Sequence, residues 1–169
     1  EPMPPEYMDR DARIKRMEEQ GLEGAWLFPT LGVLYEEPLK KDVDALCTTF
    51  AAFNRWLEED WGFGYQGRIF TSPYITLADV GWACEQLEWA LERDARLVVM
   101  RPSAVFTRNG PRNPGHEDFD PFWARVNEAG ITVVTHIGAT RHDSHGYDVK
   151  NTDLLGLGSR PRVANYHRS

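Results

Sequence analysis

The stretch GITVVTHIG, residues 130–138, decides the fold of this chain. Its β-branched residues from Ile131 to Thr135 predict a buried strand, and Gly130 marks the end of the helix before it. The strand ends in His136, and a rigid strand end fixes the direction of an imidazole. We interpret His136 as a metal ligand; the alternative is a histidine that is hydrogen-bonded inside the core.

Three further strands precede this one, and a helix separates each strand from the next. The hydrophobic pattern predicts strands over 22–28, 67–74, 95–100 and 131–136, and helices over 9–20, 39–57, 77–91 and 120–129. Such alternation is typical of βαβ units. The chain is therefore expected to form an α/β fold with four mutually parallel strands.

The links that leave the strands are long, whereas the links that enter them are short. Long links follow the first strand (29–38), the third strand (101–118) and the fourth strand. In parallel α/β folds, ligands bind in the loops at the carboxyl ends of the strands. Arg101 directly follows the third strand, so its planar guanidinium is a candidate for binding a substrate carboxylate. A salt bridge to an acidic loop residue is the alternative.

Other candidate residues give weaker signals. His142, Asp143 and His145 follow the fourth strand without a helix to fix their spacing, and a solvated loop is the simpler interpretation. His116 lies in the third exit loop, where a surface role is favoured. Cys47 and Cys84 both fall at apolar helix positions, so we interpret them as small buried hydrophobic residues and not as a disulfide or metal pair.

Composition and missing motifs exclude several classes of protein. The formal net charge is −7, and the basic residues are scattered, which argues against a nucleic-acid partner. No apolar run of membrane-spanning length and no signal peptide are present, so we expect a soluble cytoplasmic protein. The sequence also lacks the glycine-rich nucleotide loops and the G-x-S-x-G elbow of serine hydrolases.

The ordered segments resemble the amidohydrolase-related family, the branch of the amidohydrolase superfamily typified by aminocarboxymuconate semialdehyde decarboxylase. The resemblance covers about residues 7–138 and is carried by YMDRDARIKRMEEQGLEGAWLFPT (7–30), GRIFTSPYITLADVGWACEQLEWAL (67–91), ARLVVMRPS (95–103) and DPFWARVNEAGITVVTHIG (120–138). It implies a metal-dependent (β/α)₈ barrel of the TIM-barrel type, with a divalent ion, commonly zinc, at the carboxyl ends of the strands. The family's metal-binding histidine matches His136, and Arg101 falls where a strand end approaches the substrate.

The chain also departs from the family pattern. The paired H-x-H of the first barrel strand has no counterpart, because no histidine precedes His116. The family's later strands have no counterpart after residue 150. A complete barrel of this kind takes about 250 residues. We therefore expect residues 1–169 to be a single (β/α) domain or the central fragment of one, a partial barrel in which 139–169 is a loop or irregular tail.

These observations predict a metal-dependent hydrolase or decarboxylase that acts on a small carboxylated substrate. A bound divalent metal ion would lower the pKa of a water molecule and polarise the substrate carbonyl. The alternative is a metal-free α/β binding or assembly module without catalytic activity. An open four-stranded sheet exposes apolar faces that barrel closure covers, so either function favours a homo-oligomer.

Overall fold

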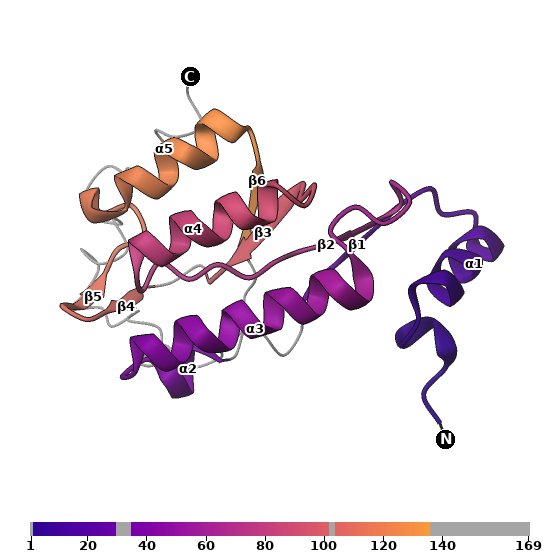
Figure 1. The fold of residues 1–169 in the computed structure, drawn as a ribbon, viewed down its shortest axis with the longest axis horizontal. Coiled ribbons are helices and arrows are strands. Elements are labelled where there is room, and N and C mark those ends of the chain that lie inside the picture. Colours follow the sequence, from indigo (N-terminus) through magenta and orange to yellow (C-terminus); the bar gives the residue numbers. More distant parts are fainter. Residues whose placement is uncertain (1, 30–34, 102–103, 136–169) are drawn as a thin grey trace, which may run out of the picture.

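The computed structural model describes residues 2–29, 35–101 and 104–135 (Figure 1). The elements follow one another in the order η1 (Pro5–Tyr7), α1 (Arg10–Gln20), β1 (Ala25–Leu27), α2 (Glu36–Leu39), α3 (Val43–Trp61), β2 (Ile69–Thr71), α4 (Val80–Leu91), β3 (Leu97–Met100), β4 (Val105–Thr107), β5 (Gly110–Arg112), η3 (Glu117–Phe119), α5 (Asp120–Ala129) and β6 (Thr132–Thr135).

The four strands predicted from the sequence lie side by side and are parallel. β1 pairs with β2, and β3 pairs with β6. The chain just after β2 joins the two pairs: the Ile75 amide donates to the Val99 carbonyl at 3.0 Å, and the Val99 amide donates to the Pro73 carbonyl at 2.9 Å. Within the described residues these strands form an open series and not a closed barrel. The fold is therefore a partial (β/α) barrel, as predicted.

Side-chain caps and glycines fix where the helices begin and end. Asp9, Asp42 and Asp79 each accept a hydrogen bond from the backbone amide three residues later, which satisfies one of the free N–H groups at the start of α1, α3 and α4. Gly21 and Gly130 end α1 and α5 with φ angles of 68° and 62°. This left-handed conformation is one that glycine adopts without steric cost.

The helices α3, α4 and α5 cover the strands, while α1 lies at the end of the molecule remote from the β4–β5 hairpin (Figure 1). The apolar stripe predicted for the long helix is confirmed, since Leu46, Phe50 and Leu57 of α3 are buried. They join a core that includes Val98 of β3 and Phe122 of α5. This core holds the carboxyl ends of the strands in one place.

The structure differs from the sequence-based prediction in two helices, in one loop and in the four strands, which are shorter than predicted. The predicted helix 39–57 is divided, because Leu39 ends α2 and Asp42 caps α3. The loop predicted over 101–118 contains the antiparallel hairpin β4–β5, which turns between Thr107 and Gly110. The predicted helix 77–91 begins only at Val80, because Asp79 caps α4.

No helix within the described ranges is both long enough and apolar enough to span a bilayer. The predicted tail 139–169 lies outside the described residues, so the domain assignment stays a prediction.

Candidate functional site

The two predicted site residues follow the ends of neighbouring parallel strands. Met100 of β3 is paired with Thr135 of β6 at the last position of their ladder. Arg101 comes directly after Met100, and position 136 comes directly after Thr135. His136 itself lies outside the described residues, so its role as a metal ligand stays a prediction.

Arg101 is buried at this rim and ion-paired. Its side chain is 7% exposed, and its Nη2 donates to Oε2 of Glu37 at 3.0 Å. Oε2 of Glu36 lies 3.9 Å from Nη1. The guanidinium also stands over the Phe106 ring, 5.1 Å from its centroid. The salt bridge considered for Arg101 is thus present, while its binding of a substrate stays a prediction.

Glu36 is a buried carboxyl group at the start of α2. Its side chain is 8% exposed and lies beside the side chains of Thr76 and Tyr74. Burial raises the pKa of Glu36, and this effect outweighs the opposing influence of Thr76 and of the Arg101 charge. Burial therefore makes the carboxylate costly to keep charged.

Tyr74 follows β2 and lies beside Glu36, where it is bound by residues of α3. The Asn54 side chain accepts from the Tyr74 amide and donates to the Tyr74 carbonyl, both at 2.8 Å. The Phe50 ring, one turn earlier on α3, stacks on the Tyr74 ring with centroids 4.3 Å apart. The Tyr74 hydroxyl is buried, and among the described residues it has no partner at ordinary hydrogen-bond distance. Burial, and then the Glu36 charge, raise the pKa of Tyr74 well above its usual value.

Glu37 occupies a more open position than Glu36. Its side chain is 28% exposed, and its Oε1 lies 2.5 Å from the Lys40 ammonium. Partial burial opposes ionisation of Glu37, but the hydrogen bonds from Lys40 and Arg101 outweigh it and lower its pKa. The rim cluster, defined as Glu36, Glu37, Tyr74 and Arg101, thus combines one fully buried and one accessible carboxylate on a single guanidinium.

Sequence reasoning missed three members of the rim cluster. Glu36 and Glu37 stand together in the exit link of the first strand, and Tyr74 ends the predicted second strand. The rule that identified Arg101, attention to residues at the ends of parallel strands, applies to Tyr74, but not to Glu36 and Glu37, which come several residues after the first strand. What the rule lacked was the fold-back of α2, which brings Glu36 and Glu37 onto Arg101.

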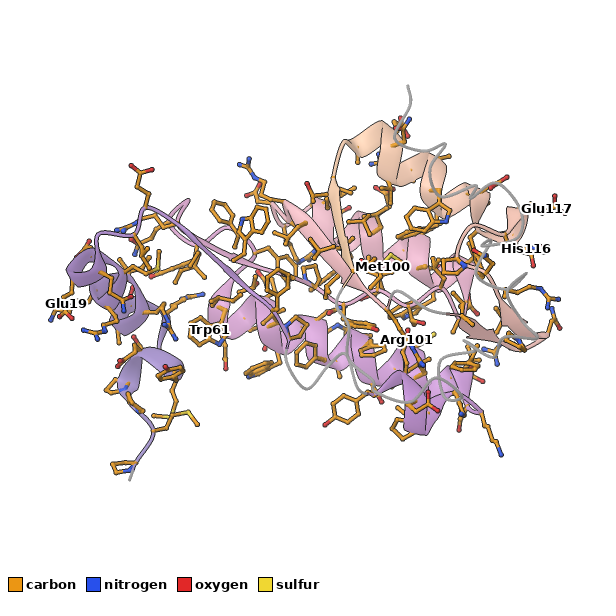
Figure 2. The ribbon with its side chains drawn as sticks, turned by 180° about the vertical axis from the view of Figure 1, so that it is seen from behind. Glu19, Trp61, Met100, Arg101, His116 and Glu117 are labelled. Atoms are coloured by element: carbon orange, nitrogen blue, oxygen red, sulfur yellow. The ribbon has the colours of Figure 1, made fainter. Side chains whose placement is uncertain are left out.

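The other candidates lie apart from the rim cluster. His116 is 39% exposed, and its Nδ1 accepts from the Asp118 amide at 3.2 Å, which fits the surface role favoured for it. Figure 2 shows His116 well separated from Arg101. Both cysteines are free; Cys47 is buried and Cys84 partly buried. His142, Asp143 and His145 lie outside the described residues.

A shallow hollow of about 280 Å³ lies between the start of α4 and the β4–β5 hairpin. Its charged lining includes Asp79, Arg108 and Asp118, and no residue of the rim cluster contributes to it. Arg108 already pairs with Asp44 at 2.6 Å and with Asp79 at 3.7 Å. The hollow is therefore a surface feature with internally paired charges.

The described residues do not by themselves fit a divalent metal ion. Across 2–29, 35–101 and 104–135, no three His, Cys, Asp or Glu side chains come together in a way that could hold one. The carboxylates of the rim cluster face Arg101 and Lys40, whose charges repel a cation. A catalytic zinc site takes three protein ligands, so a metal in the complete protein requires ligands beyond these residues.

Neither a protein-family model nor a curated protein matches the chain. Several solved structures, however, match the chain. Amidohydrolase map2389c from Mycobacterium avium subsp. paratuberculosis K-10 is 40% identical, with a TM-score of 0.78; the match covers 89% of this chain and 41% of that one.

Two decarboxylase structures share the fold at 16% identity. The 2,6-dihydroxybenzoate decarboxylase from Rhizobium has a TM-score of 0.61 over 88% of this chain and 48% of its own. The dihydroxybenzoic acid decarboxylase from Polaromonas sp. JS666, solved with manganese and the inhibitor 2-nitroresorcinol, has a TM-score of 0.62 over 88% of this chain and 47% of its own. The chain thus spans less than half the length of each of these three structures. The resemblance to the amidohydrolase superfamily that the sequence indicated is thereby confirmed, and the chain has the fold of part of a (β/α) barrel of that type.

Proposed function

We propose that the complete protein is a divalent-metal-dependent hydrolase or decarboxylase that acts on a small carboxylated substrate. The observation that carries the proposal is the 40% identity, over 89% of this chain, to a protein named an amidohydrolase. The shared fold of two dihydroxybenzoate decarboxylases supports the same general chemistry. Manganese in one of them supports a divalent ion, with zinc, the ion the sequence resemblance favours, as the other candidate.

His136 is the proposed metal ligand of this chain. It follows Thr135, whose strand ends beside Met100 and Arg101. The metal, when bound, supplies Lewis-acid chemistry. The chain's own contribution is the rim cluster, in which the guanidinium of Arg101 can bind a carboxylate.

Arg101 is the proposed substrate-binding residue. A buried guanidinium is always charged, and the Phe106 ring beside it limits its directions of approach. A substrate carboxylate bound there would place the rest of the molecule at the carboxyl ends of β3 and β6. This position is where barrel enzymes carry out their chemistry.

The test measures turnover by the complete protein. The metal is removed with a chelator and restored as zinc or manganese, and carbon dioxide release from 2,6-dihydroxybenzoate is followed beside hydrolysis of a panel of small carboxylated amides. The proposal predicts turnover that depends on the restored metal, is abolished by His136→Ala and is kept by the surface control His116→Ala. Equal turnover with and without metal would contradict it. A protein that holds no metal and turns over no substrate would favour the alternative, a metal-free binding or assembly module.

A further inference from the structure

The two carboxylates on Arg101 are not equivalent. Glu36 is 8% exposed and lies 3.9 Å from the guanidinium, whereas Glu37 is 28% exposed and accepts a hydrogen bond at 3.0 Å. The closer and directly bonded partner is therefore the one that solvent reaches. A guanidinium that is always charged and only 7% exposed needs an anion at this place at all times.

Among the residues that the structure describes, Glu37 has a second cationic partner and Glu36 does not. Lys40, three residues further along, holds Glu37 at 2.5 Å and is 34% exposed. Among the described residues the only cation paired with Glu36 is Arg101. Glu37 can therefore leave Arg101 and remain paired near the surface, whereas Glu36 would leave its buried position without compensation.

Glu36 is also fixed from the side away from Arg101. Thr76 and Tyr74 lie against its carboxyl group. Tyr74 is in turn held by Asn54 on both of its backbone polar groups. These contacts leave the guanidinium oriented by Glu36 and by the Phe106 ring when Glu37 moves.

We propose that Glu37 is an exchangeable internal ligand of Arg101. The carboxylate of a small substrate replaces Glu37 at Nη2 of Arg101. Glu37 stays paired with Lys40, and Glu36 keeps the guanidinium oriented. The ligand class is a small monocarboxylate, because the position on Nη2 that Glu37 occupies takes a single carboxylate. This inference rests on the proposed function, since it assigns a carboxylate-recognition step to the same site.

The test is equilibrium binding of benzoate to the complete protein, measured by calorimetry at fixed ionic strength near pH 7. Glu37→Gln removes the competing anion and keeps its shape. Glu36→Gln is the matched control, because it makes the same substitution at the other carboxyl group beside the same guanidinium. Lys40→Met removes the alternative partner of Glu37, and Lys41→Met is its control at the neighbouring exposed position.

Binding and turnover separate this inference from the proposed function. If Glu37→Gln tightens benzoate binding but the protein shows no metal-dependent turnover, the proposed function is contradicted and the exchange site is supported. If turnover depends on the metal but Glu37→Gln does not tighten benzoate binding, the proposed function is supported and the exchange site is contradicted.

The exchange model predicts that Glu37→Gln lowers the dissociation constant of benzoate about tenfold, a difference of about 1.4 kcal/mol. Glu36→Gln should not tighten binding, Lys40→Met should weaken it, and Lys41→Met should leave it within about twofold, the scale of a surface substitution. Equal tightening by Glu37→Gln and Glu36→Gln would mean a general charge effect and would overturn the model. An unchanged dissociation constant in Glu37→Gln, or no benzoate binding by any variant, would overturn it as well.

Discussion

Replacing Asn54 with alanine should destabilise the protein strongly, because one side chain satisfies two buried backbone groups. Asn54 is 1% exposed, and it binds the amide and the carbonyl of Tyr74, each at 2.8 Å. Alanine leaves both groups without a partner inside the core. An orphaned buried polar group costs about 1–3 kcal/mol, so Asn54→Ala should lower the free energy of unfolding by about 2–6 kcal/mol.

The assay is equilibrium unfolding in urea, followed by tryptophan fluorescence, with the free-energy difference taken from the shift in midpoint. Asn109→Ala is the matched control, since Asn109 is exposed on the hairpin turn. It should change stability by less than about 0.5 kcal/mol. If Asn54→Ala costs no more than Asn109→Ala, then α3 does not hold Tyr74, and the account of how the rim cluster is positioned fails.

Three further predictions concern the rim cluster and the cysteines. Arg101→Met leaves Glu36 buried without a cation and should lower the free energy of unfolding by about 3–5 kcal/mol. Adding Glu36→Gln to Arg101→Met should recover a large part of this loss; if the effects of the two substitutions on urea unfolding simply add, the two side chains do not interact. Because burial raises the pKa of Glu36 above 4.5, the free energy of unfolding of the wild type relative to Glu36→Gln is highest below pH 4.5 and falls as the pH rises through the raised value. Urea midpoints of both proteins from about pH 4 to pH 8 measure this difference, and a difference that grows with pH would refute the burial argument. Burial raises the pKa of Cys47 to about 12, so an alkylating agent at mildly alkaline pH should label Cys84 first and Cys47 only on unfolding; mass spectrometry of partly labelled protein decides between them.

The elements that the sequence predicted are those with local signals. Asp9 and Gly21 enclose α1, the four-three spacing of apolar residues marks α3, and the β-branched run before His136 marks β6. Each of these signals acts within a few residues of the chain and does not depend on contacts between distant segments.

The features that the sequence did not predict depend on contacts between distant segments. The break before Asp42 allows α2 to fold back and place Glu37 on Arg101, which lies 64 positions later. The hairpin β4–β5 brings Phe106 beside that guanidinium. Neither contact leaves a periodic trace in the sequence, so Arg101 was identified while its partners were not.

The metal content of the complete protein, measured by mass spectrometry for the wild type, His136→Ala and His116→Ala, decides whether β6 leads to a metal ligand. We expect about one equivalent of divalent metal in the wild type and in His116→Ala, as for a single catalytic site, and its loss in His136→Ala. Full retention of the metal by His136→Ala would contradict the claim that the strand ending at Thr135 supplies a ligand at the barrel rim.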